Sequence, residues 1–360
     1  MNEIKPKLLR LTNTIMHYSI PVNNLLSNYF DVTVAHYGKK NDDSSIKFKQ
    51  IILNPKKLGP FTYFKEDIYK LCQEYDAIIA LADLHILPFV TLGIRKKRNF
   101  SLTFYGIGVS ASYNKKLDED RKLDNIRFWL MKKADSNVFY SDYPVKRYEN
   151  AGFEKESLFV ANNTVYIPEK IEIPKEKKHF LFVGTLYKAK KIYELLDAYE
   201  IFLKKNGAPA YPLLIIGDGE ERENIKDWIE KNGYQNNILL KGAIYDQEIL
   251  KSYYKDAIAL VSPGQAGLSV LNSLAYGVPF ITTRDAITGG EIFNIRNNYN
   301  GILYSGDIME LSNIITQLAN DQEKVYELSQ NAQEFYFKNC TMDKMIAELS
   351  NSIKYALNNR

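Results

Sequence analysis

Short β-branched and aromatic runs alternate with amphipathic helical stretches along the whole chain, and this alternation constrains the fold more than any other feature. In the first half the strand-like runs are residues 7–12, 31–36, 76–81, 100–105, 137–141 and 157–162. In the second half they are residues 179–184, 212–217, 237–242, 257–262, 279–283 and 301–305. Strand–helix alternation predicts parallel sheets covered by helices on both faces. The sequence therefore predicts an α/β protein with two doubly wound domains.

The boundary between these domains is predicted in residues 166–179, a stretch with two prolines, several charges and no apolar periodicity. We expect a first domain over residues 1–170 and a second over 176–340. Residues 341–360 have apolar side chains at helical spacing and follow the last strand, so this helix can pack on either domain.

Charge and cysteine content exclude several classes of protein. The formal net charge of +4 is too small to argue for a nucleic-acid partner. Residues 1–175 have an excess of seven basic side chains, and residues 176–360 an excess of three acidic ones, so the first half is expected to face something anionic. Cys72 and Cys340 form no disulfide framework, and no window is apolar enough to span a membrane. We expect a cytoplasmic protein.

Glycines follow the strands of the second half, and two of them precede an uncharged helix. Gly264 and Gly267 stand just before a helix predicted over residues 268–276. The first N–H groups of a helix lack internal partners and carry partial positive charge, so an anion such as a diphosphate can bind there without basic side chains. The alternative is a buried turn whose glycines serve close packing.

These motifs, in this order, resemble the donor domain of retaining GT-B glycosyltransferases of the family 4 type. The matching segments are Val183-Gly184-Thr185-Leu186 with Lys190, Ile216-Gly217-Asp218-Gly219, Gly242-Ala243-Ile244, Gly264-Gln265-Ala266-Gly267-Leu268 with Asn272, Gly277-Val278-Pro279, Gly289-Gly290-Glu291-Ile292 and Asn300-Gly301. The resemblance covers about residues 180 to 305. It implies two facing Rossmann-like domains, with the terminal helix crossing back to the first, acceptor-side domain.

The chain departs from this family at charged positions. Thr185 stands where the family has arginine, with Lys188 or Lys191 as candidate substitutes. The paired glutamates of the family's E-x7-E motif fall on Gly264 and Asn272. Asn272 retains an acceptor and a donor for a ribose hydroxyl, whereas Gly264 offers only backbone. Either the donor contacts are rewired in a variant branch, or the enzyme is weakened.

The resemblance implies a role for each matching residue. Lys190 would neutralise the donor diphosphate. The other donor-binding residues would be Gly184, Thr185, Gly217, Ile244, Gly264, Gln265, Ala266, Gly267, Leu268, Asn272 and Glu291. His17 and Tyr105 are further catalytic candidates, because each follows or ends a first-half strand. Asp83, His85 and Gly106 are acceptor-side candidates for the same reason, although a lone histidine is more often structural.

The resemblance implies transfer of a sugar from a UDP- or GDP-linked donor to a hydroxyl of a glycan, lipid-linked or protein-linked acceptor. It calls for no metal or other cofactor, and no His, Cys or Asp cluster has metal-ligand spacing. A non-catalytic partner of another transferase and a GT-B nucleotide-sugar epimerase are the alternatives. Residues 93–100 and 115–135 are basic, and the second predicts a helix that either contacts anionic lipid or covers buried aromatic side chains.

Overall fold

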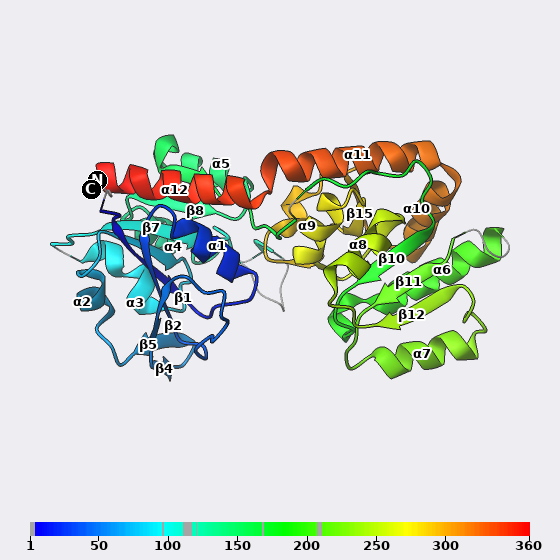
Figure 1. Ribbon diagram of the computed structural model, residues 1–360, viewed down its shortest axis with the longest axis horizontal. Helices are drawn as coiled ribbons and strands as arrows, with labels where there is room; N and C mark the ends of the chain where they lie inside the picture. Colours follow the sequence, from blue (N-terminus) through cyan, green and yellow to red (C-terminus); the bar gives the residue numbers. More distant parts are fainter. Residues whose placement is uncertain (1–3, 96, 111–116, 120, 168, 207–210) are drawn as a thin grey trace. The chain divides into compact units, whose positions relative to one another are not determined.

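The computed structural model describes residues 4–95, 97–110, 117–119, 121–167, 169–206 and 211–360. The chain forms two compact α/β units, and the boundary between them falls at Tyr166, at the start of the predicted linker (Figure 1). Of the described residues, those from 4 to 110, 118 to 166 and 342 to 360 belong to the first unit, and Leu117 with Ile167–Thr341 to the second. Each unit contains a parallel sheet with helices on both faces, which confirms the predicted fold class.

The first unit contains a seven-stranded parallel sheet. Its strands are β1 (Lys7–Thr12), β2 (Asp31–His36), β3 (Lys49–Ile52), β6 (Ala77–Leu81), β7 (Ser101–Gly106), β8 (Ser136–Phe139) and β9 (Leu158–Val160). They lie in the order β3-β2-β1-β6-β7-β8-β9. The order reverses between β1 and β6, so the loops after these two strands meet at the carboxyl edge of the sheet.

Helices cover both faces of this sheet. One face packs against α1 (Ser19–Leu26) and α12 (Met342–Asn358). The other packs against α2 (Ile68–Cys72), α3 (Leu87–Val90), α4 (Asp124–Met131) and α5 (Val145–Asn150). The short 3-10 helices η1 (Leu92–Ile94) and η2 (Lys155–Ser157) lie in connections. The terminal helix is thus part of the first unit, because Met345, Leu349 and Ile353 repeat at helical spacing and enter its core.

The second unit contains a six-stranded parallel sheet in the order β12-β11-β10-β13-β15-β17. The strands are β10 (His179–Val183), β11 (Leu213–Ile216), β12 (Ile238–Gly242), β13 (Ala257–Val261), β15 (Phe280–Thr283) and β17 (Gly301–Tyr304). The helices are α6 (Ile192–Asn206), α7 (Arg222–Lys231), α8 (Gln247–Lys255), α9 (Leu268–Ala275), α10 (Ile308–Asn320) and α11 (Gln322–Asn339). A short ladder joins β14 (Gln265–Ala266) to β16 (Ile287–Thr288).

The strands predicted from the sequence are incomplete, and one predicted helix is too long. β3 and the exposed hairpin of β4 (Pro55–Leu58) and β5 (Phe61–Phe64) are not among the predicted strands, because these short runs contain lysines and prolines. The helix predicted within residues 115–135 is shorter, since α4 begins at Asp124; residues 115, 116 and 120 lie outside the described residues. Its aromatic residues also divide: Phe128 packs on Tyr148, whereas Trp129 is 53% exposed.

Candidate active site

The loops after β10 and β13 lie side by side at the carboxyl edge of the second sheet. The strand order reverses between β10 and β13, with β11 on the other side of β10. Parallel α/β sheets bind ligands at such a reversal, because the connecting helices leave it on opposite faces. The backbone N–H of Gly264 donates to the carbonyl oxygen of Lys190 over 3.1 Å and joins the two loops. The fold therefore brings together the lysine motif and the glycine motif.

Lys190 is a buried cation at the end of the 3-10 helix η3 (Lys188–Lys190). Only 8% of the residue is exposed, and burial lowers the pKa of its ammonium to about 8. Its Nζ lies 5.8 Å from the centre of the Tyr187 ring, and no carboxylate within the described ranges raises its pKa. Buried ammonium groups are normally paired, so this environment favours an anionic ligand.

The lysines on either side of this position have different surroundings. Lys188 and Lys191, the candidate substitutes for the family's arginine, are both exposed. Lys191 adopts a left-handed backbone conformation with φ of 53°, and its Nζ lies 3.2 Å from a carboxylate oxygen of Glu194. Lys190 is therefore the buried cation of this segment, and Lys188 and Lys191 can contact a ligand only at the surface.

Two glycines allow the loops around Lys190 to approach each other closely. A Cβ at Gly217 would lie 1.9 Å from the carbonyl oxygen of Gly184, so any side chain at 217 would push the end of β11 away from the end of β10. A Cβ at Gly184 would lie 3.3 Å from Nζ of Lys190. The glycines thus keep the strand ends close together and leave room for the ammonium group.

Gly264 and Gly267 have different local roles. A Cβ at Gly264 would lie 2.1 Å from the carbonyl oxygen of Ala189, so this glycine is required by packing within the chain. A Cβ at Gly267 would meet nothing within 4 Å. Gly267 is the N-cap of α9 with φ of −107°, a conformation open to any residue, so neither packing nor backbone strain requires glycine there. The open space at the helix N-terminus is compatible with a bound anion.

Gln265 and Ala266 are fixed by contacts on both sides. Their ladder with Ile287 and Thr288 brings the Gly289-Gly290-Glu291 segment next to this loop. The hydroxyl of Tyr187 donates to Oε1 of Gln265 and connects the loop after β10 to the loop after β13. Tyr187 is not among the residues predicted from the sequence, because a tyrosine in a loop has no distinctive pattern.

Glu291 is buried in the same region. Its Oε2 accepts a hydrogen bond from the backbone N–H of Gly289 over 3.0 Å and lies 3.4 Å from Oγ1 of Thr288. Only 6% of the residue is exposed. The carboxylate thus holds the Gly289–Gly290 turn in place, and direct contact with a donor sugar stays a prediction.

The remaining donor-side residues lie around this centre. Leu268 and Asn272 are both half-buried and one turn apart on α9, so they share a face of the helix. Thr185 is exposed directly after Gly184. Ile244 is half-buried in the loop after β12, which is separated from β10 by β11. The structure therefore gathers most predicted donor residues at one reversal of the sheet and places Ile244 toward its edge.

The first-unit candidate His17 lies in the loop between β1 and α1. It lines an open cavity of about 470 Å³ together with the apolar side chains of Ile20, Pro21 and Leu25 and with Tyr166. This volume is within the range of small-molecule sites. His17 therefore borders a space into which an acceptor group can fit.

Asp83 and His85 follow β6, the other strand at the reversal of the first sheet. Nδ1 of His85 lies 2.9 Å from Oδ1 of Asp83, and both side chains are exposed. The backbone N–H of Thr62 in β5 donates to the carbonyl oxygen of His85 over 2.7 Å. The pair is thus held at the carboxyl edge of the sheet, on the loop that the hairpin supports.

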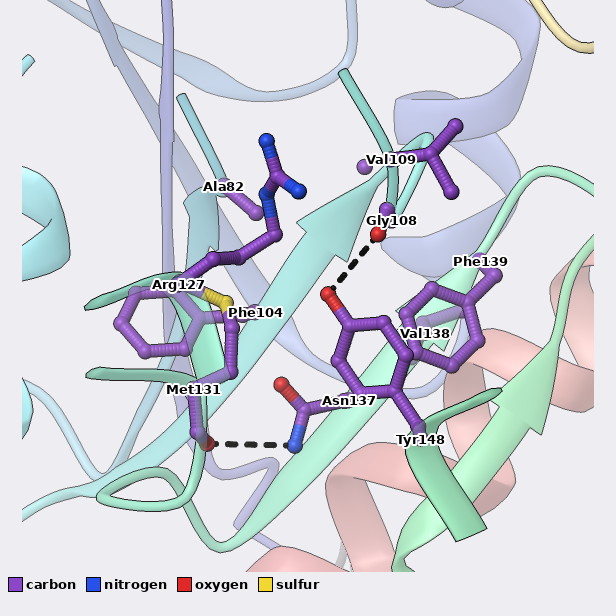
Figure 2. Close-up of a pocket in the computed structure, with 11 residues that line it drawn as sticks. Ala82, Phe104, Gly108, Val109, Arg127, Met131, Asn137, Val138, Phe139 and Tyr148 are labelled. Atoms are coloured by element: carbon purple, nitrogen blue, oxygen red, sulfur yellow. Dashed lines mark hydrogen bonds between the residues drawn. The ribbon is translucent and has the colours of Figure 1, made fainter. Parts of the chain in front are cut away.

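Tyr105 and Gly106 belong to the core rather than to an open loop. Tyr105 is 4% exposed and packs between the guanidinium of Arg10 and the ring of Tyr140. Gly106 borders a small cavity of about 10 Å³, room for about one water molecule. Phe104 and Tyr148 also line this cavity (Figure 2). This position gives Tyr105 a packing role, and a catalytic role for it stays a prediction.

Metal-ligand clusters and membrane-spanning helices are both absent from the described residues. Within the described ranges there is no group of three His, Cys, Asp or Glu side chains arranged to bind a metal ion. Among the helices that the structure describes, none has the length and apolar character needed to span a bilayer.

Residues 166–335 match the family model described as glycosyl transferases group 1. The match covers just under half of the chain, so it marks residues 166–335 as similar to this family. The matched stretch largely coincides with the second unit, which contains Lys190 and Gly267. A curated relative, the poly(glycerol-phosphate) alpha-glucosyltransferase of Bacillus subtilis, is 25% identical over 217 residues. That match covers 57% of this chain, and the chain spans only 30% of the length of that relative.

Solved glycosyltransferase structures share the whole two-unit architecture. HepE of Anabaena, solved in complex with UDP, superimposes with a TM-score of 0.71 at 17% identity and covers 97% of this chain and 99% of its own. A glycosyltransferase of Rickettsia africae gives a TM-score of 0.72 at 16% identity, and the match covers 99% of this chain and 100% of that one. These neighbours share the fold of this chain, two Rossmann-like α/β units of the GT-B type.

Proposed function

We propose that this chain transfers a sugar from a nucleoside-diphosphate sugar, with UDP as the nucleotide, to an acceptor hydroxyl. The observation that carries the proposal is the buried ammonium of Lys190 without a carboxylate partner within the described ranges, at the strand reversal of the second unit, which is similar to group 1 glycosyl transferases. The UDP bound to the similar HepE supports the choice of nucleotide. The family resemblance supports retention of the anomeric configuration.

In the proposed reaction, the bond from the sugar C1 to the diphosphate oxygen breaks, and its electron pair leaves with UDP. A bond from C1 to the acceptor oxygen forms, and the acceptor hydroxyl gives up its proton. Negative charge grows on the diphosphate as it leaves, so a fixed cation and a helix N-terminus beside it stabilise the transition state more than the ground state. Lys190 and the first N–H groups of α9 have this role.

The acceptor is proposed to bind at the carboxyl edge of the first sheet. His17, with Asp83 and His85 on the neighbouring loop, supplies side chains that can bind or deprotonate a hydroxyl there. The acceptor class is a glycan, lipid-linked or protein-linked hydroxyl. The name of the Bacillus subtilis relative adds a poly(glycerol-phosphate) chain to the acceptors worth testing.

The test is a thermal-shift and calorimetric screen of the purified chain against UDP, GDP and their sugars, followed by detection of free UDP. A transferase releases UDP slowly from its donor by leakage to water and faster when acceptor is added. Tight binding of UDP-sugar without any UDP release would instead favour a non-catalytic partner, an alternative suggested by Gly264 and Asn272 in place of glutamates. Interconversion of two UDP-sugars would favour an epimerase.

A further inference from the structure

Lys191 adopts a backbone conformation that favours glycine. Its φ is 53°, in the left-handed region, which is uncommon for a residue with a Cβ. Glycine would make the same turn between η3 and α6 without strain, so the backbone alone does not call for a lysine here. Strained residues cluster at ligand-binding segments, and this lysine directly follows Lys190 in the donor loop. The side chain of Lys191 is therefore a candidate for a functional contact.

The stem of Lys191 fills part of the space beside Gly264. Its Cγ lies 2.9 Å from an ideal Cβ at position 264, so the stem lies where a side chain at 264 would begin. Its Nζ is 3.2 Å from Oε1 of Glu194, and 45% of the lysine side chain is exposed. The resembling family carries a glutamate at position 264. In this chain a positive side chain thus lies where a negative one would be.

The proposed function, on which this inference rests, determines what Lys191 would border. The diphosphate is assigned to Lys190 and the N-terminus of α9, and the ribose to Asn272, one turn along that helix. The ribose and the sugar are joined to opposite ends of the diphosphate. The sugar therefore extends away from Asn272, toward the residues that precede the helix, and Gly264 is among them. Lys191 then lies at the exposed rim of the sugar end of the site.

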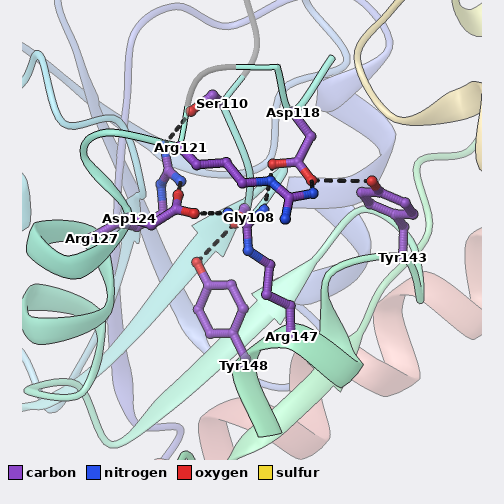
Figure 3. Close-up of polar contacts among 9 residues, drawn as sticks. All are labelled: Gly108, Ser110, Asp118, Arg121, Asp124, Arg127, Tyr143, Arg147 and Tyr148. Carbon is purple, nitrogen blue, oxygen red and sulfur yellow. Dashed lines mark hydrogen bonds and ion pairs between the residues drawn. The ribbon is translucent and has the colours of Figure 1, made fainter. Parts of the chain in front are cut away.

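The arginines beside the loop after β7 are engaged by carboxylates of their own unit (Figure 3). Asp124 pairs with both Arg127 and Arg147, and Arg147 also pairs with Asp118. Both aspartates are buried, at 7% exposure each. Removing a partner from such a network would leave an uncompensated buried charge, so these arginines are poor candidates for binding an anionic sugar.

We propose that the donor sugar carries a carboxylate, which makes the substrate class a UDP-linked hexuronic acid. The ammonium of Lys191 exchanges Glu194 for the carboxylate at C6 of the sugar. This exchange is easy, because the two side chains are 45% and 30% exposed and exposed ion pairs add little net stability. A neutral hexose lacks the charge and gains nothing from the ammonium. The lysine thus selects the charged sugar.

The experiment is calorimetry of the full chain with UDP and two pairs of donors, UDP-glucose with UDP-glucuronic acid and UDP-galactose with UDP-galacturonic acid. We expect at least one uronic acid donor to bind at least about tenfold more tightly than its neutral partner, the gain expected for a charge-assisted contact. High salt should reduce this preference, because the contact lies at the surface. Two pairs are used since the charge does not determine the orientation of the C4 hydroxyl.

Lys191→Gly removes the ammonium and relieves the left-handed backbone, so it should melt no lower than the parent. It should bind UDP as the parent does and lose the preference for uronic acid. Lys191→Gln keeps the strained backbone without the charge and should lose the preference as well. Lys97→Gly is the matched control, because Lys97 is an exposed lysine of the first unit with a φ of 63°; it should keep the parental preference.

Three results would overturn this inference. The parent would bind neither uronic acid donor more tightly than its neutral partner, or Lys191→Gly would keep the preference. Alternatively, Lys191→Gly would weaken UDP as strongly as the uronic acid donors, which would put the lysine on the diphosphate. In all three cases UDP still binds, so the proposed transfer from a UDP-sugar stands. A parent that binds no UDP would refute the proposed function, and this inference with it.

Discussion

Replacing Lys190 with methionine should make the free protein more stable and the nucleotide site weaker. Burial lowers the pKa of this lysine from 10.5 to about 8. At neutral pH the ammonium is charged in both the folded and the unfolded chain, so holding it in the fold costs about 3 kcal/mol. Methionine has a similar length without the charge. We therefore expect Lys190→Met to raise the melting temperature at pH 7 by roughly 5 to 10 °C.

The pH dependence follows from the same shift. The free energy that the fold loses by burying the charged ammonium is fully present below pH 8 and disappears between pH 8 and 10.5. The stability gained by Lys190→Met should therefore fade over that range. In the proposed site UDP pairs with the charged form of Lys190, so the affinity of the parent for UDP should fall about tenfold for each pH unit above 8. Binding at pH 9 should be accompanied by proton uptake.

Calorimetry with UDP between pH 7 and 9.5, in buffers of different ionisation enthalpy, measures both the affinity for UDP and the number of protons taken up on binding. Lys190→Met should bind UDP roughly 10- to 100-fold more weakly at pH 7, the loss expected for one charge-assisted contact, and its affinity should not vary above pH 8. Turnover should fall at least tenfold. Lys188→Met is the matched control, because that lysine is exposed, and it should keep the parental pH profile.

Two results would refute this reasoning. A Lys190→Met protein that melts below the parent would mean that the ammonium stabilises the fold through contacts with the chain. A parent whose UDP affinity is constant up to pH 9.5 would mean that the lysine does not face the diphosphate.

Three further variants test other parts of the two units. Gly267→Ala should melt like the parent, because its Cβ meets nothing within 4 Å, yet it should bind UDP about tenfold more weakly by calorimetry. Asn272→Leu should weaken UDP and UDP-sugar by a similar factor; an effect on acceptor affinity alone would contradict a ribose contact. Leu349→Ala, at 1% exposure, should lower the free energy of unfolding by about 2 to 5 kcal/mol in urea titrations, provided that α12 is integral to the first core.

The sequence predicted the two sheets well because buried parallel strands leave a strong signal. Each of the twelve predicted strand runs overlaps an observed strand, and β1 and β2 match to the residue. Buried strands are continuous β-branched or aromatic runs, which few loops imitate. The edge strand β3 was missed because Lys49 and Gln50 break its apolar character, and edge strands need less burial.

The candidate site was predictable as a set of loops but not in its contacts. Strand order determines which loops meet, and glycine motifs identified the loops after β10 and β13. Burial of Tyr105 could not be foreseen, because a strand-end tyrosine faces solvent or core according to sheet register. The partners of Asp118 and Asp124 were also hidden, since Arg147 comes from α5 and approaches only in the folded chain.

The backbone around position 264 leaves no room for the glutamate side chain that the resembling family has there. The space that a side chain at 264 would need is filled by backbone, with the Ala189 carbonyl oxygen 2.1 Å from an ideal Cβ. The Gly264 N–H bond to Lys190 fixes that arrangement. Restoring a carboxylate by Gly264→Glu should therefore displace the Ala189–Lys190 segment and lower stability without improving turnover. The absence of a side chain at 264 is thus matched by the close approach of the Ala189–Lys190 segment, which carries the buried Lys190, to the loop after β13.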